Sequence, residues 1–171
     1  GPEQEKNGKV IPRIAQDIQA GLTIIGRRDA SNDPKGKRIN LILADVSGCD
    51  LKLANLKNAI MLKANLFMAN LNNSELFDSD LRRAKLDEAF LIGTDLMKAD
   101  LRDASLCGTN LRGANLSGVD FRGANLTGAN LKETNLTGAK AYKSQRQHFF
   151  DADGAIESFD QMIWFENPEK G

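Results

Sequence analysis

The sequence contains little cysteine and histidine, on which many catalytic and metal-binding sites depend. Its 171 residues include 2 Cys and a single His, His148. Two cysteines cannot build a disulfide framework, and they lack the close spacing typical of a zinc site. Gly-rich phosphate loops and serine-nucleophile motifs are also missing. We therefore expect no catalytic residues, no cofactor and no metal site, and predict that the protein is not an enzyme.

An excess of charge of one sign and long apolar runs are absent too. Lys and Arg together number 23, and so do Asp and Glu, which gives a formal net charge of zero. A strong non-specific nucleic-acid binder usually has a basic excess, so nucleic acid is not the expected partner. No apolar run is long enough to cross a membrane. Aromatic residues make up only 6% of the chain, so the core must be built from aliphatic side chains.

What the sequence does contain is a strict period of five between residues 39 and 140. Large apolar residues occupy one position of the repeat: Leu41, Val46, Leu51, Leu56, Met61, Leu66, Leu71, Leu76, Leu81, Leu86, Leu91, Leu96, Leu101, Leu106, Leu111, Leu116, Phe121, Leu126, Leu131 and Leu136. The position two residues earlier is small or β-branched in every unit after Ile39, and is most often Ala. The residue between the two is usually Asn or Asp.

A period of five fits neither an α-helix, which repeats every 3.6 residues, nor a flat strand, which repeats every 2. It fits a short strand followed by a turn, and four such units close one square coil. The large and the small apolar residues then point inward, and each coil pairs with the next through backbone hydrogen bonds. The sequence therefore predicts an all-β solenoid of about five coils, ~24 Å tall.

This ladder resembles the A-[DN]-L-x-x signature of the pentapeptide-repeat family. The resemblance covers residues 39–140, about 60% of the chain. It implies a right-handed quadrilateral parallel β-helix, which needs short N- and C-terminal helical caps because the ends of a solenoid are open.

The N-terminal part, residues 1–38, lies outside the repeat. It opens with Gly1-Pro2, which is typical of a tag remnant, followed by polar residues that we expect to be loose. A helix is predicted over 12–26, where apolar residues share one face, and it should cap the first coil. The loop over 27–38 carries five basic residues. We interpret it as a solvated connector, with a patch for phosphates or acidic lipids as the alternative.

The C-terminal part, residues 141–171, is predicted to be a capping segment. Asp153 could start a helix in which Ile156, Phe159 and Ile163 share one face, and this helix should cover the last coil. A membrane-docking helix is the alternative, but the polar face lacks Lys and Arg.

The corners of the coils are predicted to differ along the chain. Gly occurs eight times at the position two after the large apolar residue, and seven of these lie after residue 90. A type II turn needs a positive φ at that position, which Gly adopts freely. We therefore expect type II corners in the later coils and other turn types in the earlier ones.

The outward-facing apolar residues are concentrated before residue 98. Folding the chain with four units to a coil gathers them around two corners: Ile60, Leu62, Phe77 and Met97 around one, and Phe67, Met68, Phe90 and Ile92 around the opposite one. Exposed apolar patches usually mark an interface. The alternative is that the N-terminal helix and loop of the protein cover one of them.

Outward charges also repeat once per coil. Asp80, Asp100 and Asp120 form one column, and Arg82, Arg102 and Arg122 form the next on the same wall. A ladder of weak surface salt bridges is the main interpretation. A cation site on the aspartates or an anion site on the arginines is the alternative.

These features favour a non-enzymatic structural scaffold or protein–protein interaction module, which binds an unidentified protein partner or a second copy of itself. The alternative comes from the resemblance, because some pentapeptide-repeat proteins mimic DNA and bind type II topoisomerases such as gyrase. That activity needs a long acidic face, whereas this repeat holds 12 basic and 12 acidic residues.

We expect a cytoplasmic protein. The N-terminal segment also resembles the entry segment of bacterial, especially cyanobacterial, pentapeptide proteins, some of which are tethered to membranes. This favours membrane association of the native full-length protein through an anchor that this chain lacks.

Overall fold

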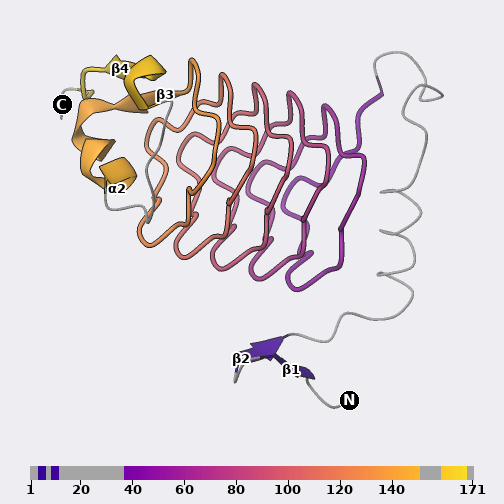
Figure 1. Cartoon of the computed structure of the whole chain (residues 1–171). Helices are drawn as coiled ribbons and strands as arrows, with labels where there is room; N and C mark the ends of the chain where they lie inside the picture. The colour runs from indigo at the N-terminus through magenta and orange to yellow at the C-terminus, as the bar shows by residue number, and fades with distance from the viewer. Residues whose placement is uncertain (1–3, 7–8, 12–36, 151–158, 169–171) are drawn as a thin grey trace.

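The computed structural model describes residues 4–6, 9–11, 37–150 and 159–168. Residues 37–140 form a stack of square coils in which each strand residue bridges its equivalent in the next coil in parallel register, as in Asp80↔Asp100 and Asp100↔Asp120. The coils follow one another along a single axis (Figure 1). The period of five therefore produces the four-sided parallel solenoid that the sequence predicts.

The five positions of a repeat can be named on the unit that starts at Ala99. Ala99 is the small residue, Asp100 the strand residue, Leu101 the central residue, Arg102 the first turn residue and Asp103 the second turn residue. The four walls are numbered in chain order: wall 1 carries the central residues Leu41 to Phe121, and walls 2, 3 and 4 begin at Val46, Leu51 and Leu56. Each wall has five rungs, one per coil.

Nearly every backbone N–H group of a repeat has a defined partner. The central, strand and second turn residues donate to neighbouring coils, as Leu101 does to the Asp120 carbonyl at 2.9 Å. The next small residue closes the turn, as Ala104 does by donating to the Leu101 carbonyl at 3.1 Å. Only the N–H of the first turn residue remains for a side chain to satisfy. Since buried and half-buried backbone groups must be paired, this pattern holds the coils in one register.

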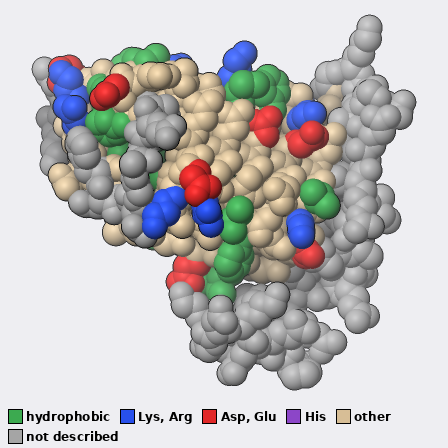
Figure 2. Space-filling model, viewed as in Figure 1, with side chains coloured by type: hydrophobic (Ala, Val, Ile, Leu, Met, Phe, Trp, Pro, Cys, Tyr) green, Lys and Arg blue, Asp and Glu red, His purple; other side chains and the backbone are tan. Residues whose placement is uncertain are grey.

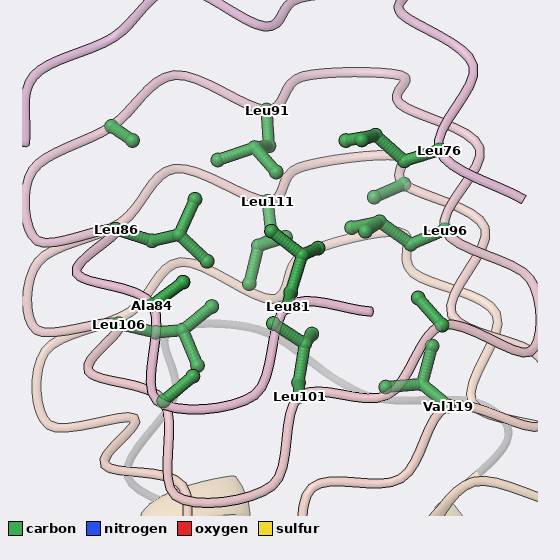
Figure 3. Packing of buried hydrophobic residues seen from close by; sticks show 14 of the residues in the cluster. Leu76, Leu81, Ala84, Leu86, Leu91, Leu96, Leu101, Leu106, Leu111 and Val119 are labelled. Atoms are coloured by element: carbon green, nitrogen blue, oxygen red, sulfur yellow. The ribbon is translucent and has the colours of Figure 1, made fainter. Parts of the chain in front are cut away.

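The core is the interior of the square prism. Central and small residues from the four walls converge on the axis, and leucines at equivalent positions of successive coils stack directly, such as Leu91 on Leu111 (Figure 3). From Val46 to Leu136 every central residue is buried. The inward assignment of both apolar columns is therefore confirmed.

The predicted change of turn type between early and late coils is wrong. All 20 second turn residues have a positive φ, whether they are Gly or not: non-glycine residues such as Arg83 lie at 54–61° and glycines such as Gly113 at 64–78°. The hydrogen bonds to the neighbouring coils fix this conformation and override the preference of the residue. A non-glycine residue in this region costs about 1 kcal/mol, and none of the 12 is β-branched.

The last coil is closed by a cap that includes β3 (Lys140–Tyr142), η2 (Lys143–Gln145), α2 (Arg146–Phe150), η3 (Phe159–Gln161) and β4 (Ile163–Phe165). Phe149 is buried and stands edge-on to Phe121 and to Trp164, with ring centroids 5.8 Å apart in both cases. Figure 1 shows α2, β3 and β4 gathered at this end of the stack. Aromatic side chains are concentrated here, since six of the ten in the chain fall within residues 141–171.

The helix predicted from Asp153 to Ile163 is wrong at its end, because the described part has one 3-10 turn, η3, and is then extended. Ile163 lies in β4, which pairs in parallel with β3 in the register Lys140↔Ile163. The N–H of Gly138 donates to the Gln161 carbonyl at 2.9 Å, and that of Ile163 to the Ala139 carbonyl at 2.7 Å. The open backbone edge of the last coil explains the difference, because a strand satisfies its N–H and C=O groups and a helix does not. Asp153 and Ile156 lie outside the described residues.

Near the N-terminus of the chain, β1 (Gln4–Lys6) and β2 (Lys9–Ile11) pair antiparallel in the register Glu5↔Val10. The expectation that these first polar residues are loose is therefore wrong. The helix predicted over 12–26 and most of the basic loop lie outside the described residues. Within the part that the structure describes, no helix is long and apolar enough to span a lipid bilayer.

Candidate interaction surface

The strand residue determines much of the chemistry of the outer surface. In 15 of the 20 units it is Asn or Asp, and in all 15 its side-chain oxygen accepts the N–H of the first turn residue at 3.0–3.4 Å. This Asx turn supplies the one N–H partner that the backbone cannot provide. The five exceptions all fall between residues 60 and 105: Ile60, Glu75, Lys85, Phe90 and Ser105. In these five units the strand residue is not the Asn or Asp that the Asx turn uses, so the repeat does not account for these side chains.

Phe90 and Ile92 are the most exposed residues of the predicted patch. They flank the central Leu91 on the middle rung of wall 3, and their exposed fractions are 42% and 38%. Because Phe90 has no oxygen to offer, the Ile92 N–H donates instead to Asn72 Oδ1 of the preceding coil, at 2.8 Å. The coil thus presents two large apolar side chains to solvent, and the hydrogen bond to Asn72 of the preceding coil takes the place of the missing Asx turn.

The other predicted corner lies between walls 4 and 1. Phe77 and Met97 stack one coil apart, since the Asp78 N–H donates to the Met97 carbonyl at 3.0 Å. The ammonium group of Lys98 lies 5.8 Å from the centre of the Phe77 ring. Ile60 and Leu62 sit on wall 1 and are half-buried, as are Phe77 and Met97. These four residues are therefore less accessible than Phe90 and Ile92.

Two members of the second predicted cluster are less exposed than expected. Met68 is only 7% exposed, and Phe67 is half-buried. A methionine side chain is unbranched and flexible, so one that leaves a corner outward can still lie along the surface. Met68 thus contributes little accessible area to an interface.

The Asp and Arg columns form a ladder of ion pairs on wall 1, in which each arginine binds the aspartate of its own rung. Arg82 Nε and Nη2 donate to the two carboxylate oxygens of Asp80 at 2.8 and 2.7 Å, and Arg102 and Arg122 bind Asp100 and Asp120 in the same bidentate way. Longer contacts of 3.8 and 3.9 Å connect successive coils. The hydrogen bonds from Arg82 hold the pKa of Asp80 below its usual value. Because the charges neutralise one another, the geometry favours the salt-bridge ladder over an ion-binding site.

This ladder also reaches the C-terminal cap. The Arg122 guanidinium lies 4.7 Å from the centre of the Phe165 ring in β4. Wall 1 therefore continues from the repeat through β3 into β4 as a single parallel ladder. Sequence reasoning missed this connection because β4 is outside the repeat and was expected to be helical.

Gln145 is a second feature that the sequence did not reveal. Its side chain is buried, and its Nε2 donates to the carbonyls of Phe121 and Ala124, both at 2.8 Å. Its Oε1 accepts the N–H groups of Gly123 at 3.1 Å and Tyr142 at 2.8 Å. The side-chain amide of Gln145 thus makes hydrogen bonds to backbone groups at the end of the stack, where no further coil is present to bind them.

The reactive side chains are dispersed. Cys49 and Cys107 are both free, and burial raises the pKa of the Cys49 thiol to about 12. Within the described residues, no group of three or more His, Cys, Asp and Glu side chains could hold a metal ion. On the face shown in Figure 2, acidic and basic side chains lie next to one another and hydrophobic ones form separate patches. The apolar positions of the first three coils are therefore the most distinctive feature of the surface.

The comparison with protein families gives one match. The family described as pentapeptide repeats matches residues 37–73, 74–113 and 114–145, in eight copies. No curated protein matches the chain.

Solved structures with a similar fold are pentapeptide repeat proteins. One from the Arabidopsis thaliana thylakoid lumen is 33% identical, with 70% of this chain and 80% of that chain covered and a TM-score of 0.58. One from the cyanobacterium Cyanothece 51142 is 26% identical, with coverages of 75% and 86% and a TM-score of 0.55. QnrB1, a plasmid-mediated fluoroquinolone resistance protein, is 25% identical over 62% of this chain and 57% of its own, with a TM-score of 0.40. The similarities to the Arabidopsis and Cyanothece proteins confirm the right-handed quadrilateral β-helix.

Proposed function

The chain belongs to the pentapeptide-repeat family, and we propose that it is a non-enzymatic scaffold that binds a protein partner through the outer faces of its first three coils. In this proposal residues 39–140 are the interaction module, and residues 141–171 close its end. The proposal places the protein in the cytoplasm, where its two free thiols stay reduced.

The observation that carries this proposal is the concentration of outward-facing apolar side chains in the first three coils, which include the exposed pair Phe90 and Ile92. Both occupy positions where most units have polar residues, and the unit with Phe90 has no Asx turn because Phe90 lacks a side-chain oxygen. Departures from a local structural rule tend to occur at functional sites, because folding alone does not select for them. Burying either side chain in an interface would contribute ~1.5–3 kcal/mol.

The charges of the shaft argue against DNA mimicry. A mimic of duplex DNA needs a continuous acidic face, whereas the repeat holds 12 acidic and 12 basic residues. The aspartates of wall 1 are neutralised by bidentate arginines. We therefore do not extend a topoisomerase-binding activity to this chain.

The test is partner capture with matched variants. Wild-type protein, the early-coil variant Phe77→Ser plus Met97→Ser and the late-coil control Thr127→Ala plus Thr137→Ala are immobilised in equal amounts and exposed to extract of the source cell. Any captured protein is then purified and titrated against each variant by calorimetry. We expect the early-coil variant to lose binding and the control to keep it. Equal binding by all three forms would contradict the proposal.

A further inference from the structure

The outer face of wall 3 has the layout of a self-complementary interface. Its five rungs present, as strand residue and first turn residue, Asp50 and Lys52, Asn70 and Asn72, Phe90 and Ile92, Asn110 and Arg112, and Asn130 and Lys132. The apolar pair lies on the middle rung, asparagines lie on the rungs next to it, and charged residues lie on the first, fourth and fifth rungs. Protein interfaces have the same arrangement, with an apolar centre and a polar rim.

We propose that wall 3 binds a second copy of this chain side by side, about a two-fold axis parallel to the axis of the coils. This inference rests on the proposed function, and it identifies a second copy of the chain as the partner that binds the apolar patch on wall 3. A two-fold axis requires a patch that is complementary to itself. With this axis, the strand residue of each rung faces the first turn residue of the same rung in the second copy.

Each rung of wall 3 satisfies this requirement. Phe90 faces Ile92 of the second copy, and Asp50 faces Lys52 of the second copy, each contact occurring twice. Asn70 faces Asn72, which pairs amide with amide. On the last two rungs an asparagine faces a cation, Arg112 or Lys132, and Arg112 also forms an ion pair with Glu133 of its own chain at 2.7 Å. On every rung except the apolar middle one, a side-chain oxygen of the strand column thus faces a donor in the second copy.

The opposite orientation, with the coils antiparallel, fits less well. It would bring Lys52 of one copy against Lys132 of the other, because the first and last rungs would then face each other. Like charges in direct contact across an interface disfavour association. The charges of the wall therefore select the side-by-side orientation.

Wall 1 has a similar column order but is a poorer candidate. Its Asp and Arg side chains already form bidentate pairs within one chain, as between Arg102 and Asp100. A second copy would add little to them. Its apolar pair, Ile60 and Leu62, is half-buried and lies toward one end of the wall. Wall 3 instead has its exposed apolar pair at the centre.

The size of the wall sets the expected strength. Five rungs are ~24 Å tall and four residues are ~13 Å wide, which gives about 300 Å² per copy. A standard stable interface buries about 800 Å² per partner. We therefore expect weak association that depends on protein concentration.

Sedimentation velocity of the full chain, from micromolar to millimolar concentration, tests this inference. The key variant is Phe90→Asn plus Ile92→Arg, which gives the middle rung the residues of the next one, Asn110 and Arg112, and should fold normally. The control is Ile60→Asn plus Leu62→Arg, the same change on wall 1. We expect the wild type and the control to dimerise and the key variant to bind about tenfold or more weakly. A wild type that is monomeric throughout, or equal loss in both variants, would overturn the inference.

A charge exchange on the first rung tests the orientation. Asp50→Lys and Lys52→Asp should each weaken self-association, because like charges then face each other across the axis. A mixture of the two variants should restore it. Stronger association of Lys52→Asp alone would overturn the side-by-side orientation, since that result fits the antiparallel one.

These outcomes separate the inference from the proposed function. A protein that stays monomeric but binds a purified partner through Phe77 and Met97 would overturn the dimer and leave the scaffold function intact. A dimer that depends on wall 3, together with partner binding that is unaffected by Phe77→Ser plus Met97→Ser, would support the inference and contradict the wider proposal.

Discussion

Outward-facing residues of the shaft do not all have the same importance. Asn115 faces solvent, yet its Oδ1 accepts the Ser117 N–H at 3.3 Å and its Nδ2 donates to Asp95 Oδ1 at 3.0 Å. It therefore supports both its own turn and the neighbouring coil. Sequence patterns identify the Asn/Asp column, but its role becomes clear only when every backbone N–H of the repeat has been assigned a partner.

Shortening a central leucine should cost more than removing one of these asparagines. Leu91→Ala and Leu101→Ala remove buried atoms and leave a cavity, so each should lower the free energy of unfolding by ~2–5 kcal/mol. Asn115→Ala should lower it by about 1 kcal/mol, because it removes hydrogen bonds that are half exposed. Urea unfolding measures both. Equal losses would mean that the inward and outward columns are misassigned.

The two thiols should differ in reactivity. Cys49 is fully buried and its pKa is about 12, so almost none of it is thiolate at pH 8. Burial also raises the pKa of the Cys107 thiol, but this side chain is partly exposed. A chromogenic thiol reagent should therefore modify one cysteine slowly in the native protein and two after unfolding. Two fast equivalents in the native state would contradict this expectation.

At the scale of elements, the end of the stack shows where repeat-based prediction stops. The periodicity fixes the rungs of residues 39–140, but it contains no information about the segment that closes the last coil. The apolar spacing of residues 153–165 suits a helix, whereas the free backbone edge beside Ala139 favours a strand. Hydrogen bonds to the last coil stabilise the strand, and the local sequence of residues 153–165 gives no sign of these bonds.

Replacing Gln145 should destabilise this cap. Gln145→Leu leaves two backbone carbonyls and two N–H groups without their partner, which should lower the free energy of unfolding by about 2–4 kcal/mol. The exposed neighbouring change Gln147→Leu is the control. Chemical unfolding followed by Trp164 fluorescence measures the effect. A Gln145→Leu protein as stable as the control would show that the amide is not needed to close the coil.

The wall 1 ladder should make stability depend on pH in a defined direction. Hydrogen bonds from Arg82 lower the pKa of Asp80 in the folded state, so their stabilisation is present above the ordinary aspartate pKa of about 3.9 and is lost as pH falls through the lower folded value. Arg82→Gln removes these bonds. The difference in Tm between wild type and this variant should therefore be largest near neutral pH and shrink below pH ~4.

Lys63→Gln, which removes a charge from an exposed side chain on the same wall, is the control for this measurement. Its difference in Tm from wild type should change less over the same range. A difference for Arg82→Gln that stays constant from neutral to acidic pH would contradict the assigned ladder.

At the scale of the whole molecule, the fold could be predicted far more completely than the site. The central positions run from Leu41 to Leu136 without a slip in phase, and this predicts a continuous column of inward residues, which four units to a coil arrange on four walls. The outward residues carry no such constraint. Their clustering was predicted from the repeat of the coil, but the burial of Met68 and the exposure of Phe90 depend on side-chain conformation that the repeat does not determine.

The central claim about the whole molecule is that wall 3 joins two copies of the chain, and its most direct test is a dilution series of amide NMR spectra. Signals that shift with protein concentration mark the residues at the contact. The account predicts that the shifts centre on Phe90, Leu91 and Ile92, extend to the neighbouring rungs of wall 3 and spare the C-terminal cap. Shifts confined to β4 and α2, or spectra unchanged up to millimolar concentration, would contradict it.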